Sequence, residues 1–565
     1  MAFVIDQPNC SCCHQCKVTC PVGAIRFKNR KYWIDPDKCI SCGVCAKHCH
    51  NGVISNPDAP VIEPEKHDRI NRQCDLLVLG AGGTGLVAAV RAAMRSGGKT
   101  KVIVLEKARE IGGNTWYAKG FGFKYSRLHR ENGVADNRYN DIRNFLNETH
   151  WDEDPALVAN VFKSSEEFAD WLMDGCGMAE NFQWGLLNWG EGVCFVNSAP
   201  NLFPTPDSSI GPGGAGSFMV LKMKEFCDEL GVEILTEHEA VKLIMGDDGA
   251  VAGVLAKDPG GETEISCRAC LLATGSFSRN PEYMAMANPN TALEGEPIHL
   301  FSVPTCTGDG IRMAEEIGAE IDYKNFCALT LGPSHHPYGF AKVCLCREPE
   351  IAEVDINGKR FASEEKWGTH RNVSNRIPGL ISYGIADRHI AEMCMERLIA
   401  KRKDGEAGKN IFRNFDAEVA EEEPLNESVW VADTLWELAE KVGLPPETFT
   451  AEIEKYNGFA RSGRDTDFFK GAEVMVPIEK PPFYAILQKR FQENARGGCK
   501  TDAETRVLNK RGEIIPGLFA AGDTASGLLQ GSDFISSTVE RTVSALTWAL
   551  TSGFMAGNAI AEFLG

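Results

Sequence analysis

Hydrophobic and polar positions follow a strand–helix–strand order between residues 76 and 106. An apolar run at residues 76–79 predicts a buried strand, which leads directly into the motif Gly-x-Gly-x-x-Gly at residues 80–85. A helical segment and a second apolar strand follow, and Glu106 stands 21 residues after the last glycine. Such glycines let the backbone approach a pyrophosphate at a helix N-terminus, and such an acidic residue is placed for ribose hydroxyls. The pattern predicts a Rossmann-like unit that binds a dinucleotide, without deciding between FAD and NAD.

A long apolar stretch lies near the other end of the chain. Residues 542–561 carry no charge over twenty positions, which is about the length of a membrane span. Six of these residues are Thr, Ser or Asn, and the stretch follows a glycine-rich segment. We therefore predict a buried helix in a large soluble core and no membrane insertion.

Composition narrows the class of protein. A chain of 565 residues has room for roughly three or four domains, and its 43% hydrophobic and 24% charged residues are typical of a globular protein. The formal net charge of −19 argues against nucleic acid and anionic membrane surfaces as partners. The first residues contain no basic region followed by a long apolar run, so no secretory signal is expected.

Cysteines concentrate at the start of the chain, where nine of the 21 lie within the first 49 residues. A disulfide framework would suit a small secreted domain, so metal ligation explains this density better. The spacing Cys-x2-Cys-x2-Cys-x3-Cys occurs at residues 10–20 and again at residues 39–49, with His50 where a second proline would stand. Zinc prefers two separated Cys-x2-Cys pairs, and the doubled run does not match that pattern.

The doubled run resembles the bacterial two-cluster ferredoxins over residues 3–58. In that family the fourth cysteine of each run ligates the other cluster. The resemblance implies one 4Fe–4S cluster held by Cys10, Cys13, Cys16 and Cys49, and a second held by Cys39, Cys42, Cys45 and Cys20. Residues 1–60 hold seven Lys or Arg against four Asp or Glu. A basic electron relay of this kind suits docking against the acidic remainder of the chain or against an acidic carrier.

Three later segments resemble the flavoproteins of the fumarate reductase/succinate dehydrogenase family and their ketosteroid dehydrogenase relatives. They are KAREIGGNTWYAKGFGF after Glu106, CLLATGSF at residues 270–277 and IPGLFAAGDTASG from residue 515, and the likeness runs from about residue 74 to the end. It implies FAD, with Asp523 bonding the ribityl chain and the final helix directing its positive end at the flavin. Some family members bind FAD covalently through a histidine beside the GG segment; none stands there, so we expect non-covalent FAD. The implied FAD residues are Gly80, Gly82, Gly83, Thr84, Gly85, Glu106, Lys107, Gly112, Gly113, Asn114, Thr115, Ala273, Thr274, Gly275, Gly522 and Asp523.

The expected fold class is α/β: a Rossmann-like FAD-binding domain with an inserted α+β cap, preceded by a small α+β ferredoxin-like domain. The expected boundaries are 1–60 for the ferredoxin domain, 61–73 for a linker, 74–279 for the first part of the FAD-binding domain, 280–401 for the substrate cap, and 402–565 for a helical segment with the second part of the FAD-binding domain.

The same resemblance implies catalytic candidates. Arg371 best matches the arginine that donates a proton in fumarate reductases; because the pKa of arginine exceeds about 12, that role needs a base-assisted relay. An ion pair inside the cap is the alternative. His336 stands where the family has a substrate-carboxylate contact. Tyr484 resembles the flavin-facing tyrosine of ketosteroid dehydrogenases, with simple packing as the alternative.

The chain also departs from the fumarate reductases, which carry a histidine just before the second GG and an arginine beyond AAGE. Here residues 491–498 read FQENARGG, so Glu493 becomes the candidate in that place, and no arginine occupies the second position. Arg496 or Arg541 could substitute only with different geometry. We therefore do not expect a dicarboxylate site. Cysteines outside the two runs, such as Cys306, are expected to be reduced structural thiols.

These features favour an oxidoreductase that reduces or forms a carbonyl-activated C=C bond at FAD. Electrons would pass singly through the two clusters, to or from a ferredoxin, a flavodoxin or a partner redox subunit. Two alternatives stay open: an enzyme like adenylylsulfate reductase, and an electron-transfer subunit of a larger complex. No second nicotinamide fingerprint is visible. Oxygen-sensitive clusters and reduced thiols suit the cytoplasm of an anaerobe, and the oligomeric state is open.

Overall fold

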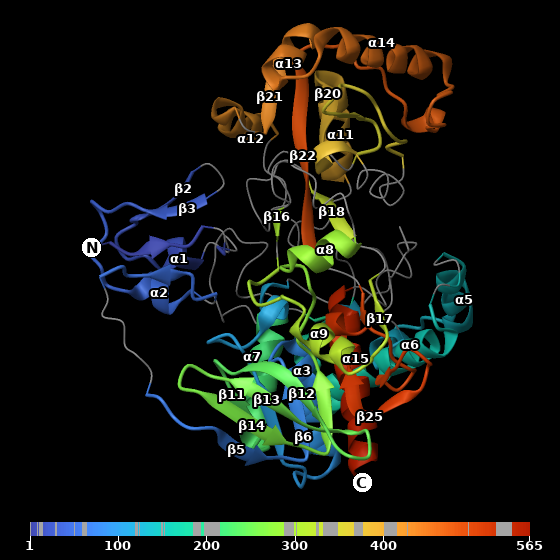
Figure 1. The fold of residues 1–565 in the computed structure, drawn as a ribbon. Coiled ribbons are helices and arrows are strands. Elements are labelled where there is room, and N and C mark those ends of the chain that lie inside the picture. Colours follow the sequence, from blue (N-terminus) through green and yellow to red (C-terminus); the bar gives the residue numbers. More distant parts are fainter. Residues whose placement is uncertain are drawn as a thin grey trace.

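A computed structural model shows three parts of the chain in Figure 1: a small N-terminal part at one side, a large lower part and an upper part joined to it by a long strand. The structure describes residues 2–7, 9–10, 15–28, 31–49, 51–58, 65–118, 122–123, 125–148, 151, 153–184, 194–196, 215–287, 299–300, 302–323, 327–331, 348–365, 377–400, 415–426, 428–494, 497–526 and 545–565.

The N-terminal part packs two short helices against two small sheets. Its elements are β1 (Val4–Ile5), α1 (Gln15–Thr19), β2 (Ile25–Lys28), β3 (Lys31–Ile34), α2 (Val44–Lys47) and β4 (Ile54–Ser55). Strand β1 pairs with β4 and β2 with β3, both antiparallel. Each helix begins within one of the two cysteine runs, so the core mixes Ile25, Tyr32 and Ile54 with cysteines.

The end of the predicted linker joins the lower part. Strand β5 (Ile70–Gln73) pairs in parallel with β14 (Glu262–Ser266). Just before it, His67 Nε2 lies 2.9 Å from Asp258 Oδ1. The carbonyl of Asp68 and the carboxylate of Asp258 raise the pKa of His67. The connection from the N-terminal part is therefore tied to a sheet over its last residues.

The lower part is built on a six-stranded sheet in the order β11-β7-β6-β15-β25-β24. Its strands are β6 (Leu76–Leu79), β7 (Val102–Leu105), β11 (Glu233–Leu235), β15 (Ala269–Leu272), β24 (Arg506–Leu508) and β25 (Ile514–Ala520). Every residue of β6, β7 and β15 is buried, as expected for parallel strands covered on both faces. Helices α3 (Gly83–Arg95) and α15 (Ala545–Leu564) pack together in the same core.

A second sheet and several helices complete the lower part. The sheet runs β12 (Glu239–Met245), β13 (Val251–Lys257), β14 and β5. The other elements are β8 (Gly122–Phe123), α4 (Arg127–Glu131), α5 (Arg138–Glu148), α6 (Pro155–Asp170), β9 (Phe182–Trp184), β10 (Cys194–Val196), α7 (Ala215–Glu229), α8 (Pro281–Ala287), α9 (Asp309–Glu316), β17 (Ile321–Asp322) and β23 (Gly498–Cys499). Helix α6 begins with proline after Asp154, whose side chain accepts a hydrogen bond from the Ala156 amide at 2.8 Å and caps the helix.

The upper part surrounds the twelve-residue strand β22 (Phe483–Asn494), visible as the long vertical arrow in Figure 1. Its strands are β16 (His299–Leu300), β18 (Cys327–Leu331), β19 (Ala352–Asp355), β20 (Ile381–Asp387) and β21 (Val429–Ala432), and its helices are α11 (Arg388–Ala400), α12 (Phe415–Glu422), α13 (Leu435–Val442) and α14 (Pro446–Ser462). Strands β20, β21, β18 and β16 all pair with β22.

The hydrophobic cores cross the domain boundaries expected at residues 280 and 401. One hydrophobic core of the upper part extends from Ile351 to Leu487, well past residue 401. Conversely, Met313, Ala314 and Ala319 were expected in the cap but belong to a core of the lower part. The reason is tertiary: β22 is distant in sequence but supplies the strand on which the cap sheet assembles.

The described part of the uncharged stretch near the C-terminus lies in α15, whose residues Leu550, Phe554 and Ile560 are buried in the lower core. Within the described part of the chain, none of the helices has the length and apolar character needed to cross a membrane.

Candidate active site

A cavity opens at the carboxyl ends of the parallel strands. Ligands of open α/β sheets bind at this edge. All the predicted FAD residues line the cavity except Gly85, Gly112 and Gly522. The lining also includes Leu79, Leu105, His238, Ala240, Val303, Thr305, Cys306, Asp309 and Ala549, which sequence reasoning did not select as FAD residues.

The glycine turn after β6 explains why two glycines are required. Gly80 has φ +108°, and a β-carbon there would lie 2.3 Å from the carbonyl oxygen of Ala273. A β-carbon on Gly85 would lie 2.0 Å from the carbonyl oxygen of Gly80. Gly85 therefore lets α3 pack closely on the turn, although it does not line the cavity. The amide of Gly83, at the start of α3, donates to Thr115 Oγ1 at 3.3 Å.

Glu106 is held rigidly at the wall of the cavity. One carboxylate oxygen accepts from the Ala81 amide at 3.0 Å and the other from the Ala108 amide at 2.8 Å. Burial raises the pKa of Glu106, while these amides oppose the rise by stabilising the charged form. The remaining lone pairs suit the ribose hydroxyls expected from the sequence.

The segment 303–309 forms a wall that was assigned to the cap from sequence. Lys107 Nζ donates to Thr307 Oγ1 at 2.5 Å and forms an ion pair with Asp309. The Val303 amide donates to Asn114 Oδ1 at 2.8 Å. These contacts tie the segment to predicted FAD residues. In the sequence, the only sign that this segment contacts the FAD site was the turn TGDG at residues 307–310. Its partner Lys107 lies about 200 residues earlier in the chain.

The turn that precedes Asp523 is fixed by α15. The Gly522 amide donates to Ser552 Oγ at 2.9 Å, and Trp548 Nε1 donates to the Gly522 carbonyl at 3.2 Å.

Burial, with a further contribution from Asp523, raises the pKa of Cys306 to about 11. The Cys306 thiol is therefore protonated at neutral pH and presents a small, uncharged surface to the cavity.

The cysteines of the N-terminal part lie in two groups. Cys20, Cys39, Cys42 and Cys45 line one small cavity, which we call the second cysteine group. Cys49 instead lies close enough to Cys10 for the two sulfurs to interact electrostatically. We call Cys10 and Cys49, together with Cys13 and Cys16 that the ferredoxin resemblance assigns to them, the first cysteine group; Cys13 lies outside the described residues. The fourth cysteine of each run thus sits with the other run.

The surroundings of Cys49 fit a cluster ligand. Burial raises the pKa of this thiol, and hydrogen bonds from the backbone of Val53, Asn51 and Gly52 oppose the rise. Backbone donors around cysteine sulfurs are one of the means by which proteins set cluster potentials. Asn51 Nδ2 is also buried, without a hydrogen-bond partner among the described residues.

The predicted catalytic residues are placed less completely. Arg371 and His336 lie outside the described residues, and of Glu493 only the backbone, in β22, is described. Tyr484 is 3% exposed and lies at the start of β22, far along the strand from its pairing with β16 and β18. Its ring lies edge-on to that of Phe415, with 5.2 Å between the two ring centroids. Tyr484 does not line the cavity, and its position favours the packing alternative.

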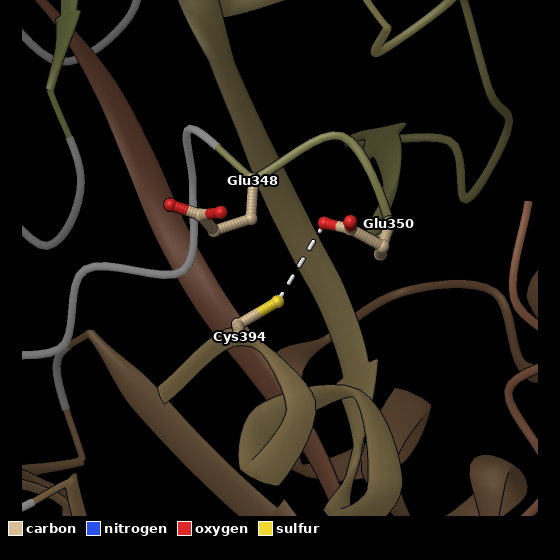
Figure 2. A group of neighbouring side chains, drawn as sticks. All are labelled: Glu348, Glu350 and Cys394. Carbon is tan, nitrogen blue, oxygen red and sulfur yellow. Dashed lines mark hydrogen bonds between the residues drawn. The ribbon is translucent and has the colours of Figure 1, made fainter. Parts of the chain in front are cut away.

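A separate polar group lies in the cap, as Figure 2 shows. The side chains of Glu348, Glu350 and Cys394 approach to within 4.8 Å of one another. Cys394 Sγ donates a hydrogen bond to Glu350 Oε2 at 3.6 Å. The thiol acts here as a donor to a buried carboxylate, so we interpret the contact as structural.

Comparisons with known proteins agree with the site. Residues 75–536 match the family described as FAD binding domain, and residues 32–55 match the 4Fe-4S binding domain. A vinyl phenol reductase of Lactiplantibacillus plantarum is 26% identical, over 82% of this chain and 91% of that protein. A fumarate reductase (cytochrome) of Shewanella frigidimarina is 25% identical, over 90% and 82%.

Solved structures share the fold. The crystal structure of 3-ketosteroid-Δ4-(5α)-dehydrogenase from Rhodococcus jostii RHA1 aligns with a TM-score of 0.64 at 24% identity, over 88% of this chain and 100% of that one. The predicted α/β fold class and the predicted resemblance are confirmed. The chain belongs to the FAD binding domain family of the fumarate reductase and succinate dehydrogenase type, and it is an FAD-dependent oxidoreductase that carries a 4Fe–4S binding domain near its N-terminus.

Proposed function

We propose that the protein reduces a C=C bond activated by a neighbouring carbonyl or comparable group, using electrons delivered singly through two 4Fe–4S clusters. One observation carries the proposal: a single chain holds the cavity with its FAD residues and two groups of cysteines. The names of two relatives, a vinyl phenol reductase and a fumarate reductase, each describe reduction of a C=C bond.

The electrons needed for the reaction match those that the proposed one-electron carriers supply. Saturating one C=C bond takes two electrons and two protons, and two one-electron donors of the ferredoxin or flavodoxin class supply the electrons. When bound, FAD converts single-electron traffic into hydride transfer. The chain's own residues would hold and orient the cofactor: Glu106 would bind the ribose, and Asn114 and Thr115 line the cavity. A side chain near the substrate would donate the proton. Arg371 remains our candidate for that donor.

The cofactor content is a direct prediction. We expect about eight iron atoms per chain, because each of the two cysteine groups holds a four-iron cluster. We also expect FAD to appear in the supernatant after acid precipitation, since no histidine stands beside the GG segment at residues 112–113. Iron analysis and flavin fluorescence check both values. About four iron atoms, or flavin that stays with the precipitated chain, would contradict the respective part.

The substrate class is tested with the reduced protein under strict anaerobiosis. Flavin absorbance is followed while enoates, enoyl thioesters, enones, vinyl phenols, fumarate and adenylylsulfate are added separately. We expect one unsaturated class to reoxidise the flavin, and fumarate to be at least about tenfold slower. The chain lacks two residues that grip a dicarboxylate, and one charged hydrogen bond contributes about 1.5–3 kcal/mol.

Other outcomes point elsewhere. Reoxidation by adenylylsulfate alone would replace the proposal with the adenylylsulfate reductase-like alternative. If no compound draws electrons while an added ferredoxin still equilibrates with the flavin, an electron-transfer subunit becomes the better description. Fumarate as the fastest substrate would contradict the inference from the missing residues.

A further inference from the structure

Tyr117 connects the two cofactor-binding parts of the chain. Its hydroxyl donates a hydrogen bond to Asn51 Oδ1 at 2.8 Å, across 66 residues of sequence. Tyr117 ends the short helical turn Gly113–Tyr117, whose earlier residues line the FAD cavity. Asn51 belongs to the loop that follows Cys49. The contact therefore joins the N-terminal part to the wall of the cavity.

Both ends of this contact lead to cofactor residues. Tyr117 is 6% exposed and packs with Val303 and Cys306, and these two residues line the FAD cavity. At the other end, the Asn51 backbone hydrogen-bonds the sulfur of Cys49. One buried aromatic ring and one amide side chain thus span the distance between a cysteine of the first group and the cavity wall.

The second cysteine group has a different environment. Cys42 is exposed, and its neighbours Ile40 and Val22 are 60% and 40% exposed. Ile40 and Val22 also line the cavity of that group. Within the described residues, the second group is therefore open toward solvent, whereas the first group is linked through Asn51 to Tyr117.

We infer that Tyr117 and Asn51 form a latch that docks the N-terminal part on the FAD cavity, with the first cysteine group toward the flavin and the second toward the external donor. Tyr117 is a positioning residue in this arrangement. The inference rests on the proposed function for the presence of two clusters. The external donor is oxidised by one electron in each transfer, and two transfers supply the two electrons that reduce one C=C bond.

The test is a double-mutant cycle in the fully loaded protein. Tyr117→Phe removes the donor and keeps the ring, whereas Asn51→Leu removes the acceptor at similar volume. Hydrogen exchange of residues 113–118 and 51–55 reports docking without any turnover. We expect exchange in each single variant to rise about 2- to 10-fold, the equivalent of one hydrogen bond. The double variant should show no further rise, because both changes remove the same contact.

A second readout concerns electron delivery. Reduced bacterial ferredoxin serves as the donor, and flavin absorbance is followed in a stopped-flow instrument. We expect the same about 2- to 10-fold slowing in the single variants. Reduction by excess dithionite should be unchanged, because that reagent does not need the docked arrangement. Iron and FAD contents should equal those of the wild type.

Tyr139→Phe is the matched control, since Tyr139 is 78% exposed on α5 and loses only a surface hydroxyl. Unchanged exchange in both single variants, or additive effects in the double variant, would overturn the latch. If hydrogen exchange rises but ferredoxin reduces the flavin at the wild-type rate, the inferred order, with the first cysteine group toward the flavin and the second toward the donor, would be overturned. In either case, substrate should still reoxidise flavin that has been reduced chemically. Failure of the latch can therefore be distinguished from failure of the proposed function.

Discussion

Replacing Gly85 by alanine is expected to remove most of the FAD from the purified protein. The new methyl group would lie 2.0 Å from the carbonyl oxygen of Gly80 and 3.1 Å from Val78 Cγ1. A backbone oxygen cannot rotate away as a side chain can, so the turn or α3 must shift. Overpacking of this kind typically costs about 1–3 kcal/mol, which corresponds to about 100-fold weaker FAD binding at the upper end. Flavin retained after gel filtration and titration of the apoprotein with FAD measure the effect.

Gly458→Ala provides the matched control for this prediction. Gly458 lies inside α14, and no atom other than its chain neighbours and the nearby backbone of its own helix would come within 4 Å of its new β-carbon. Because alanine favours a helix over glycine by about 1 kcal/mol, we expect unchanged FAD binding and slightly higher stability. Wild-type FAD affinity in the Gly85→Ala protein would show that the turn tolerates a side chain and would contradict the structural argument.

Replacing Glu364 by glutamine is expected to destabilise the cap by about 3–5 kcal/mol, the usual cost of removing one partner from a buried ion pair. Glu364 Oε2 lies 2.9 Å from Arg360 Nη2 and 3.2 Å from Lys470 Nζ, and all three side chains are almost completely buried. The glutamine would leave the buried cations Arg360 and Lys470 with one negative charge fewer nearby. Asp465, which lies 3.1 Å from Arg360 Nη2, would remain. Urea unfolding followed by tryptophan fluorescence measures the loss, since Trp430 lies in the cap core.

The same carboxylate predicts a pH dependence. Burial alone would raise the pKa of Glu364, but Lys470 and Arg360 lower it to about 2. An unfolded glutamate titrates near pH 4.3. The contribution of Glu364 is therefore fully present above about pH 4.3 and is lost as the pH falls through about 2. We expect the stability gap between wild type and Glu364→Gln to be constant from pH 7 to about 5 and to narrow below that.

Glu437→Gln is the control on the surface of the cap. Glu437 Oε1 lies 3.2 Å from Lys441 Nζ, and both side chains are more than 40% exposed. Exposed pairs at this helical spacing contribute about 0.3–0.5 kcal/mol, so little change is expected. A Glu364→Gln protein no less stable than Glu437→Gln would show that the buried network does not support the cap.

Much of the FAD site could be predicted because its signals are local. The turn after residues 76–79, the GG segment before Asn114 and the residues around Asp523 each carry their function in a few consecutive positions, and the structure gathers them around one cavity. The crossed grouping of Cys20 and Cys49 was also implied by the ferredoxin resemblance. The wall at 303–309 and the true extent of the cap core were not expected, because their partners lie in distant segments.

Tyr484 shows the limit of transferring a role by local likeness. The segment around it matches that of a flavin-facing tyrosine, yet strand pairing places it beside Ala386 and Val431, at the end of β22 within the cap. A strand of twelve residues can carry one end into the cap core and the other toward the FAD-binding part. Which end faces the cavity depends on its partners and not on the residues of the motif.

The sequence by itself determined the cofactor chemistry of this protein, because cysteine spacing and glycine turns act over a few residues and have few structural solutions. Only the tertiary structure decided how these parts meet. The ion pair of Lys107 with Asp309, the support of Gly522 by α15 and the contact of Tyr117 with Asn51 all join positions far apart in the chain. Such contacts follow from how buried surfaces pack together, and no local pattern in the sequence encodes them.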